Sequence, residues 1–315
     1  MANRSLKKVI ETSSNNGHDL LTWITTNLEK LICLKEVNDN EIQEVKEIHT
    51  QLDEFVRYIS VLENTDDLEL HSVFISLSQL YTISIWRLKD EYPGVVFDSA
   101  AFLTNVLCEE DVSIDDEDTD PNQKKKKKKS STKKKKYIYS PAKDIACTIL
   151  VQLFENFGSS ISSLIPLLFN AIFKNLKKIM EKSKYYHATF MTTLLQLFNA
   201  ILRNSNNDDK ILDPATYAKF SKLSKTVFDS ISTDEKDFSV TFVSVLIECW
   251  TAHFKQTNFI REHSHDIIET IYSRFTEGEI GVYGFANDET RIFTAKSLAE
   301  ILFHYYFSKN ISTLH

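Results

Sequence analysis

Glycine and proline are scarce in this chain. Its 315 residues include 6 Gly and 5 Pro, whereas average usage would make about 12% of them Gly or Pro. All-β sandwiches and barrels need turn residues about every ten positions, and doubly wound α/β folds need glycines in their βα loops. The scarcity excludes both classes. Because 42% of the residues are hydrophobic and 21 are Phe, the chain can bury a core, which excludes global disorder and leaves the all-α class.

Paired cysteines and long apolar runs are also absent. The four cysteines, at positions 33, 108, 147 and 249, are far apart and form no CxxC motif, as is usual in a reducing compartment. The first residues contain no apolar segment of signal-peptide length, and no run reaches 18 uninterrupted apolar residues. We therefore expect a cytosolic or nuclear protein that is neither secreted nor membrane-spanning.

The net charge of −7 conceals two opposed blocks. Residues 109–120 carry eight acids, and residues 124–136 carry ten lysines. The rest of the chain has 27 basic and 36 acidic residues, a net charge of −9. An acidic remainder argues against a nucleic-acid-binding surface spread over the fold.

Apolar residues recur every three or four positions along most of the chain, which is the period of amphipathic helices. The pattern predicts eleven helices, with starts near Asp19, Glu41, Leu68, Val95, Pro141, Ser160, Tyr185, Pro214, Asp237, His263 and Asn287. Ser140 and Asp213 each stand before a proline, which is the expected chemistry of an N-cap followed by the first helical residue.

These helices can be paired into hairpins. The predicted pairs are 42–62 with 68–88, 95–107 with 141–157, 160–182 with 185–203, 214–231 with 237–254, and 263–275 with 287–307. The second helices recur at intervals of 73, 44, 52 and 50 residues, and the first interval becomes 45 when 109–136 is treated as an insertion. These intervals are in the range of HEAT or armadillo repeats, though slightly long, and in such repeats each hairpin buries its apolar face by stacking on its neighbours.

The predicted fold is therefore an all-α solenoid of HEAT-like hairpins. Residues 1–16 form an N-terminal segment, 17–108 the first helices, 109–136 a disordered acidic and lysine-rich loop, and 137–315 the continuation of the same solenoid. The helix from Asp19 has no hairpin partner and is expected to cap the N-terminal end. The last helix ends in four aromatic residues between positions 303 and 307. Terminal repeats are normally polar outside, so we expect a longer array.

One predicted helix carries a sequence signature. From Asn287, the pattern of Arg291, Ala295 and Leu298 resembles the second helix of a HEAT unit, with Ala299 and Leu302 completing the buried face. The segment 164–168, which contains Pro166, similarly resembles the first helix of such a unit. An ordinary amphipathic helix after a polar turn is the alternative interpretation.

No pattern indicates catalysis. Residues 278–284 have the spacing GxxGxxG, which is not the dinucleotide fingerprint. His263 and His265 are two residues apart and would point to different faces of a helix. Cys249 lies on an apolar stripe, as a packing thiol does. We predict no catalytic residue, no metal site and no cofactor.

The lysine tract is the one segment with a specific functional possibility. Its lysines are Lys124, Lys125, Lys126, Lys127, Lys128, Lys129, Lys133, Lys134, Lys135 and Lys136. Four interpretations stay open: a solvated loop partly neutralised by the adjoining acids, a nuclear-import signal, a contact with anionic lipids, and nonspecific RNA or DNA binding.

Phosphorylation could control this tract. Ser113 precedes acidic residues and resembles an acid-directed kinase site, while Ser130, Ser131 and Thr132 stand among the lysines. Phosphates at these positions would cancel lysine charge. A phosphorylation-controlled electrostatic switch is therefore a hypothesis for this segment.

The run from Tyr139 to Gly158, followed by a long apolar helix and the helix from Tyr185, resembles the N-terminal region of a particular family. These are the very large HEAT-repeat accessory proteins of the Golgi and endosomal clathrin adaptor, including their fungal members. The similarity extends from about Leu68 to Leu302 and rests on helix order and pattern. The lysine tract is a departure from that pattern.

The resemblance implies a non-catalytic cytosolic scaffold. Such a protein would bind a smaller accessory subunit that carries disordered adaptor-binding peptides. It would help to recruit or retain the clathrin adaptor on trans-Golgi and endosomal membranes during vesicle transport. Two alternatives remain: a karyopherin-like or chromatin-associated HEAT protein that uses the lysine tract, and a solenoid subunit of a large kinase-type complex.

Overall fold

The computed structural model describes residues 17–34, 39–59, 67–109, 140–182 and 188–204, and two single positions, Lys296 and Ala299. Within the five ranges, all regular elements are helical. They are α2 (Gly17–Cys33), α3 (Asp39–Tyr58), α4 (Asp67–Leu88), α5 (Val95–Cys108), α6 (Pro141–Phe157), the 3₁₀ helix η3 (Gly158–Leu164), α7 (Ile165–Lys182) and α8 (Ala188–Asn204). The predicted all-α class is confirmed.

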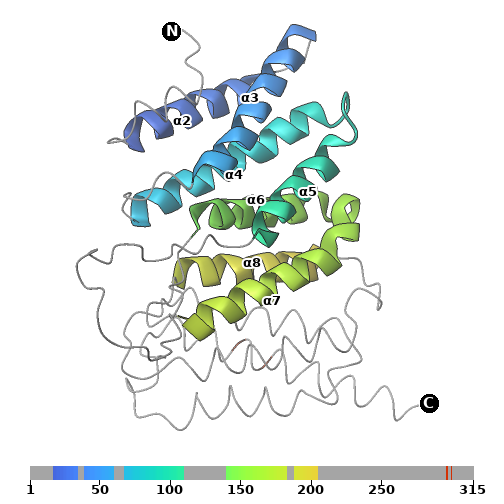
Figure 1. The fold of residues 1–315 in the computed structure, drawn as a ribbon. Coiled ribbons are helices and arrows are strands. Elements are labelled where there is room, and N and C mark those ends of the chain that lie inside the picture. Colours follow the sequence, from blue (N-terminus) through green and yellow to red (C-terminus); the bar gives the residue numbers. More distant parts are fainter. Residues whose placement is uncertain are drawn as a thin grey trace, which may run out of the picture.

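The helices form two layers (Figure 1). In the inner layer, α2 packs on α4, α4 on α6, and α6 on α8. The outer layer consists of α3, α5 and α7, which pack on α4, α6 and α8 respectively. These are three of the five hairpin pairs predicted from the sequence, stacked as in a solenoid. The helix α2 lies at one end of the described stack, as an added member of the inner layer.

The inner helices run parallel to one another. At their C-terminal ends, the rings of Trp86 on α4 and Phe157 on α6 have centroids 5.1 Å apart. Nearer the N-terminal ends, the Cys147 thiol on α6 lies 3.4 Å from the main-chain oxygen of Thr193 on α8. Equivalent positions of successive repeats therefore lie side by side across the inner layer.

Helix α6 is the centre of the core. Its fully buried residues are Ile145, Ala146, Cys147, Ile149, Leu150, Leu153 and Phe154. This helix contacts α4 and α8 in its own layer and α5 in the outer layer. Because neighbouring helices cover α6 on both flanks and on its outer side, its apolar face is wider than that of an ordinary surface helix.

One predicted helix start differs from the structure, and one predicted cap is not formed by its side chain. The helix predicted to begin at Ser160 begins at Ile165 instead, because residues 158–164 form η3. Pro166 has no N–H with which to continue α-helical hydrogen bonding into the preceding turn, and it suits the first turn of α7. Ser140 precedes Pro141 as predicted, but its side chain makes no capping hydrogen bond. Its carbonyl accepts the backbone N–H groups of Lys143 and Asp144.

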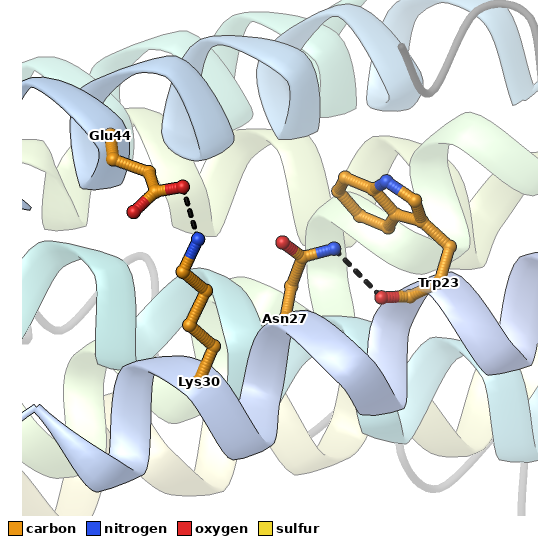
Figure 2. Close-up of polar contacts among 4 residues, drawn as sticks. All are labelled: Trp23, Asn27, Lys30 and Glu44. Carbon is orange, nitrogen blue, oxygen red and sulfur yellow. Dashed lines mark hydrogen bonds and ion pairs between the residues drawn. The ribbon is translucent and has the colours of Figure 1, made fainter. Parts of the chain in front are cut away.

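Helices α2 and α3 are joined by an ion pair. Figure 2 shows Lys30 of α2 extending to Glu44 of α3, while the Asn27 amide donates to the Trp23 carbonyl within α2, at 2.8 Å. Both charged side chains are more than a third exposed, and exposed pairs contribute about 0–1 kcal/mol. The packing of α2 on α4 is thus mainly apolar, through residues such as Ile24 and Leu31.

A buried polar network connects α3, α4 and α5 around His49. The Ser84 hydroxyl donates a hydrogen bond to the Tyr81 carbonyl at 2.7 Å. Its oxygen therefore accepts a hydrogen bond from His49 Nδ1–H at 2.9 Å. His49 Nε2 then accepts from the Ser99 hydroxyl at 3.1 Å. Both ring nitrogens are satisfied in the neutral form. Burial lowers the pKa of His49, and the nearby Asp53 carboxylate opposes this effect.

The free energy of unfolding is expected to decrease as the pH is lowered below about 6.5, the ordinary pKa of histidine. In this range the unfolded state binds a proton at position 49 while the folded state resists it, so acid favours unfolding. Melting temperatures should be measured from pH 7.5 to 5.5 for the unchanged chain and for His49→Gln. The Gln variant keeps an amide donor and acceptor without titrating, so a pH dependence as steep as that of the unchanged chain would contradict the prediction.

Gly158 allows the ends of α6 and α8 to approach closely. A Cβ at this position would lie 2.9 Å from Asn204 Cβ and 3.0 Å from the Asn204 carbonyl oxygen. The backbone of Gly158 is right-handed helical, so the requirement for glycine comes from space and not from a positive φ.

Gly158→Ala is expected to destabilise the chain by about 1–3 kcal/mol, because the added methyl group overpacks the contact with Asn204. Gly94→Ala is the matched control. Its Cβ would meet only the flexible Asp98 carboxylate at 3.3 Å, and because Ala is a poorer N-cap than Gly, we expect this variant to lose about 1 kcal/mol at most. Urea unfolding followed by circular dichroism measures both effects. Equal stability of the two variants would show that the α6–α8 contact is not tight.

The helices predicted from Pro214, Asp237 and His263 lie outside the described residues, as does most of the helix from Asn287. Lys296 and Ala299 are helical and exposed. The assignment of Ala299 to a buried face is therefore wrong. The two residues are three positions apart and share one side of the helix, and this side faces solvent.

Candidate functional site: a polar groove on the inner layer

A groove of about 600 Å³ lies across three consecutive helices of the inner layer, α4, α6 and α8. Its lining residues are Ile75, Ser78, Gln79, Thr148, Val151, Gln152, Glu155, Thr193, Gln196, Asn199, Ala200, Arg203 and Asn204. We call it the inner groove. The outer-layer helices contribute no residue to its lining. The groove is thus a product of repeat stacking and not of one hairpin.

The inner groove contains a column of glutamines at equivalent repeat positions. Gln79 lies on α4, Gln152 on α6 and Gln196 on α8. They are separated by 73 and 44 residues, the same intervals that separate the predicted starts of the second helices at 68, 141 and 185. Since the inner helices run parallel, this spacing places the three amides at the same level of adjacent helices.

The chemistry of the inner groove is polar and close to neutral. Five lining residues carry amides and three carry hydroxyls, whereas the charged side chains are Glu155 and Arg203, of opposite sign. The Gln152 amide donates to Glu155 at 3.2 Å, and the Asn204 amide donates to the Ala200 carbonyl at 2.9 Å. Amides both donate and accept hydrogen bonds, so the surface matches a ligand that offers both without net charge.

An exposed aromatic residue extends this surface along α4. Ile75 is 43% exposed and Trp86 is 46% exposed, and 11 residues of α-helix place them about 20° apart around the helix axis. Trp86 therefore lies on the face of α4 that forms one wall of the groove. Its ring contacts Phe157, and the Lys89 ammonium lies 4.9 Å from its centroid.

The predicted lysine tract and its candidate phosphosites at 113, 130, 131 and 132 lie outside the described residues. The structure describes what flanks them. The buried Lys143 at the start of α6 donates from Nζ to the Glu109 carbonyl at the end of α5, at 2.6 Å. The chain that leaves at position 109 thus returns to the same end of the α5–α6 pair. This geometry fits the prediction that 109–136 is an insertion within one hairpin.

The other predicted positions fall outside the described residues: 249, 263, 265, 278–284, 287, 291, 295 and 298. Among the described residues, no group of three or more His, Cys, Asp or Glu side chains could hold a metal ion. Burial raises the pKa of the Cys147 thiol well above its usual value, which suits a packing residue better than a nucleophile.

Sequence reasoning missed the inner groove. The apolar period locates buried faces, while amides next to an apolar stripe look like ordinary solvated positions. Aligning the second helices by their intervals of 73 and 44 residues would have placed the three glutamines in one column. That alignment was the available signal.

One stretch of the described chain, Pro141–Lys178, is long and apolar enough to cross a membrane by length and composition alone. It spans α6, η3 and the first part of α7, which fold into two layers of the stack instead of one straight rod. Core helices pass the same test of composition, and α6 is such a helix.

Comparison with known proteins gives one strong match. Over its whole length the chain is 99% identical to AP-1 accessory protein LAA1 of Saccharomyces cerevisiae (strain ATCC 204508 / S288c), of which it spans 16%. No protein-family model and no solved structure matches the chain. The resemblance to the large clathrin-adaptor accessory proteins is confirmed: the chain corresponds to the N-terminal 16% of such a protein.

Proposed function

We propose that this chain is a non-catalytic scaffold segment that joins a smaller accessory subunit and supports recruitment or retention of AP-1 on trans-Golgi and endosomal membranes. The observation that carries the proposal is the 99% identity with a protein named as an AP-1 accessory protein. Because the chain spans 16% of that protein, the segment would provide one part of the binding surface.

The two-layer stack supports a scaffold role. Repeated hairpins present long continuous surfaces, and stacked repeats commonly bind peptides or partner helices on them. In the described part, polar atoms of three repeats converge on one groove of about 600 Å³.

The proposal is tested by imaging fluorescent AP-1 in cells whose accessory protein lacks residues 1–315. We expect fewer AP-1 puncta on trans-Golgi and endosomal membranes than in cells with the full-length protein. The remaining accessory protein must be present at normal abundance, as judged by immunoblot. Unchanged AP-1 puncta would contradict the proposal, and nuclear accumulation of the full-length protein would favour the karyopherin-like alternative.

We also propose that the lysine tract at 124–136 contributes to peripheral membrane association. A lysine near an anionic leaflet contributes about 1 kcal/mol, so engagement of even half of the ten lysines would be appreciable. The contact between Glu109 and Lys143 makes the proposal testable, because an insertion that returns to its starting point can be deleted without separating α5 from α6. The acidic residues at 111–120 would oppose the attraction.

Deletion of 124–136 is expected to lower the fraction of the protein that sediments with anionic vesicles severalfold, because the attraction is electrostatic. Deletion of 111–120 is the matched control and should change the fraction in the opposite direction, since it removes the opposing acids. Vesicle sedimentation at low and high salt measures both. Equal sedimentation of all three proteins would leave the tract as a solvated loop.

A further inference from the structure

We infer that the inner groove binds an extended, uncharged segment of an AP-1 subunit through the main chain of that segment, with a bulky apolar side chain placed against Trp86. The inference rests on the proposed function, because AP-1 is the complex that the segment helps to recruit, and it adds a direct contact with AP-1 to the contact made through the accessory subunit. It adds the binding site, the conformation of the bound segment and the residues that recognise it.

The spacing of the glutamine column suits an extended chain. Packed helices lie about 8–10 Å apart, so Gln79, Gln152 and Gln196 recur about every 9 Å across the inner layer. An extended chain advances about 3.3 Å per residue. Neighbouring glutamines would therefore contact the main chain of the bound peptide at points about three residues apart. The three glutamines together would engage about six peptide residues.

The hydrogen-bonding capacity of the groove favours a main chain over a charged ligand. A peptide unit presents one N–H and one C=O, and a side-chain amide can accept from the first and donate to the second. The lining carries equal numbers of positive and negative side chains, Arg203 and Glu155, so it offers no net attraction for a phosphate or an acidic cluster. An uncharged segment is the ligand that the lining complements.

The degree of burial also suits this role. Gln152 and Gln196 are partly buried, so their positions are restricted by neighbouring residues, and both line the groove. Gln79 is exposed at the α4 wall. Side chains that are partly ordered before binding lose less conformational entropy on binding.

Trp86 provides the apolar anchor. It is 46% exposed although its ring already contacts Phe157, and this contact holds the ring in place on the groove side of α4. Partly exposed tryptophans held by packing are frequent centres of binding energy. A peptide side chain that covers the open part of the ring would bury apolar surface beside the polar column.

The experiment uses the purified 315-residue chain and fluorescent 15-residue peptides that together cover the AP-1 subunits. Binding is measured by fluorescence polarisation. We expect at least one peptide to bind saturably, and its Kd to rise about tenfold or more for Gln152→Ala combined with Gln196→Ala, and again for Trp86→Ala. N-methylation of main-chain amides in the bound peptide should weaken binding similarly, since the contacts are made by the main chain.

Gln43→Ala is the matched control, because Gln43 is an exposed amide on α3 in the outer layer. The Kd of the bound peptide for this variant should stay within about twofold of the Kd for the unchanged chain. Circular dichroism should show the same helicity for all variants. Failure of every peptide to bind, or equal affinity of the glutamine variant, overturns the inference. Recovery of intact AP-1 with the full-length glutamine variant separates the two claims: undiminished recovery rejects the groove and leaves the proposed function standing.

Discussion

Replacing Phe154 by Ala is expected to lower the free energy of unfolding by about 3–5 kcal/mol, because it leaves a cavity at the centre of the stack. Phe154 is fully buried on α6, the helix that contacts α4, α8 and α5. The helices packed on α6 belong to successive hairpins, so they cannot all move inward to fill the space. Loss of the Phe154 side chain should therefore weaken the packing between successive hairpins as well as the packing within one hairpin.

The matched control for this prediction is Phe97→Ala, since Phe97 lies on α5 and is 42% exposed. Its replacement should cost less than about 1 kcal/mol. Urea unfolding followed by circular dichroism at 222 nm gives both values. Similar losses for Phe154→Ala and Phe97→Ala would show that α6 does not occupy the centre of the core.

Replacing Tyr81 by Ala is expected to lower the free energy of unfolding by about 3–5 kcal/mol, because the change removes a buried ring and a hydrogen-bond donor together. Tyr81 is fully buried, its ring centroid lies 4.8 Å from that of His49, and its hydroxyl donates to Asp53 at 2.5 Å. The hydroxyl loses its proton with difficulty, since burial and the nearby Asp53 carboxylate raise the pKa of Tyr81 well above its usual value. It therefore stays a donor throughout the physiological range of pH.

Tyr81→Phe separates the two contributions. This variant keeps the ring and removes the donor to Asp53, so the expected loss is about 1–2 kcal/mol. Thermal and urea unfolding of the two variants should give clearly different stabilities. If Tyr81→Phe loses as much as Tyr81→Ala, the hydrogen bond and not the ring determines the stability of this region.

Much of the fold could be predicted from the sequence because helix stacking depends on apolar period. The starts of α5 and α6 were predicted at Val95 and Pro141, where the structure places them. Val45, Leu52 and Phe55 lie on one apolar stripe of α3 and are buried, as the apolar period of a helix requires. The start of α7 was missed because the small and apolar residues of η3 resemble the first turn of an α-helix. The choice between 3₁₀ and α geometry depends on local hydrogen bonds.

The candidate site was less predictable than the fold. Its glutamines are partly exposed polar residues, and such residues occur on the surface of every amphipathic helix. Only the parallel stacking of α4, α6 and α8 turns Gln79, Gln152 and Gln196 into one surface. The polar network of His49 has a similar origin, because its partners Ser84 and Ser99 belong to two other helices. Such convergence depends on tertiary contacts between segments far apart in sequence.

The most direct test of the central claim is quantitative affinity purification from cells that contain the full-length accessory protein or the same protein without residues 1–315. We expect AP-1 subunits to be recovered with the full-length protein, and their recovery to fall severalfold when the segment is removed. Absence of AP-1 subunits from the full-length sample, or equal recovery from both samples at matched abundance, would show that residues 1–315 do not help to join the protein to AP-1.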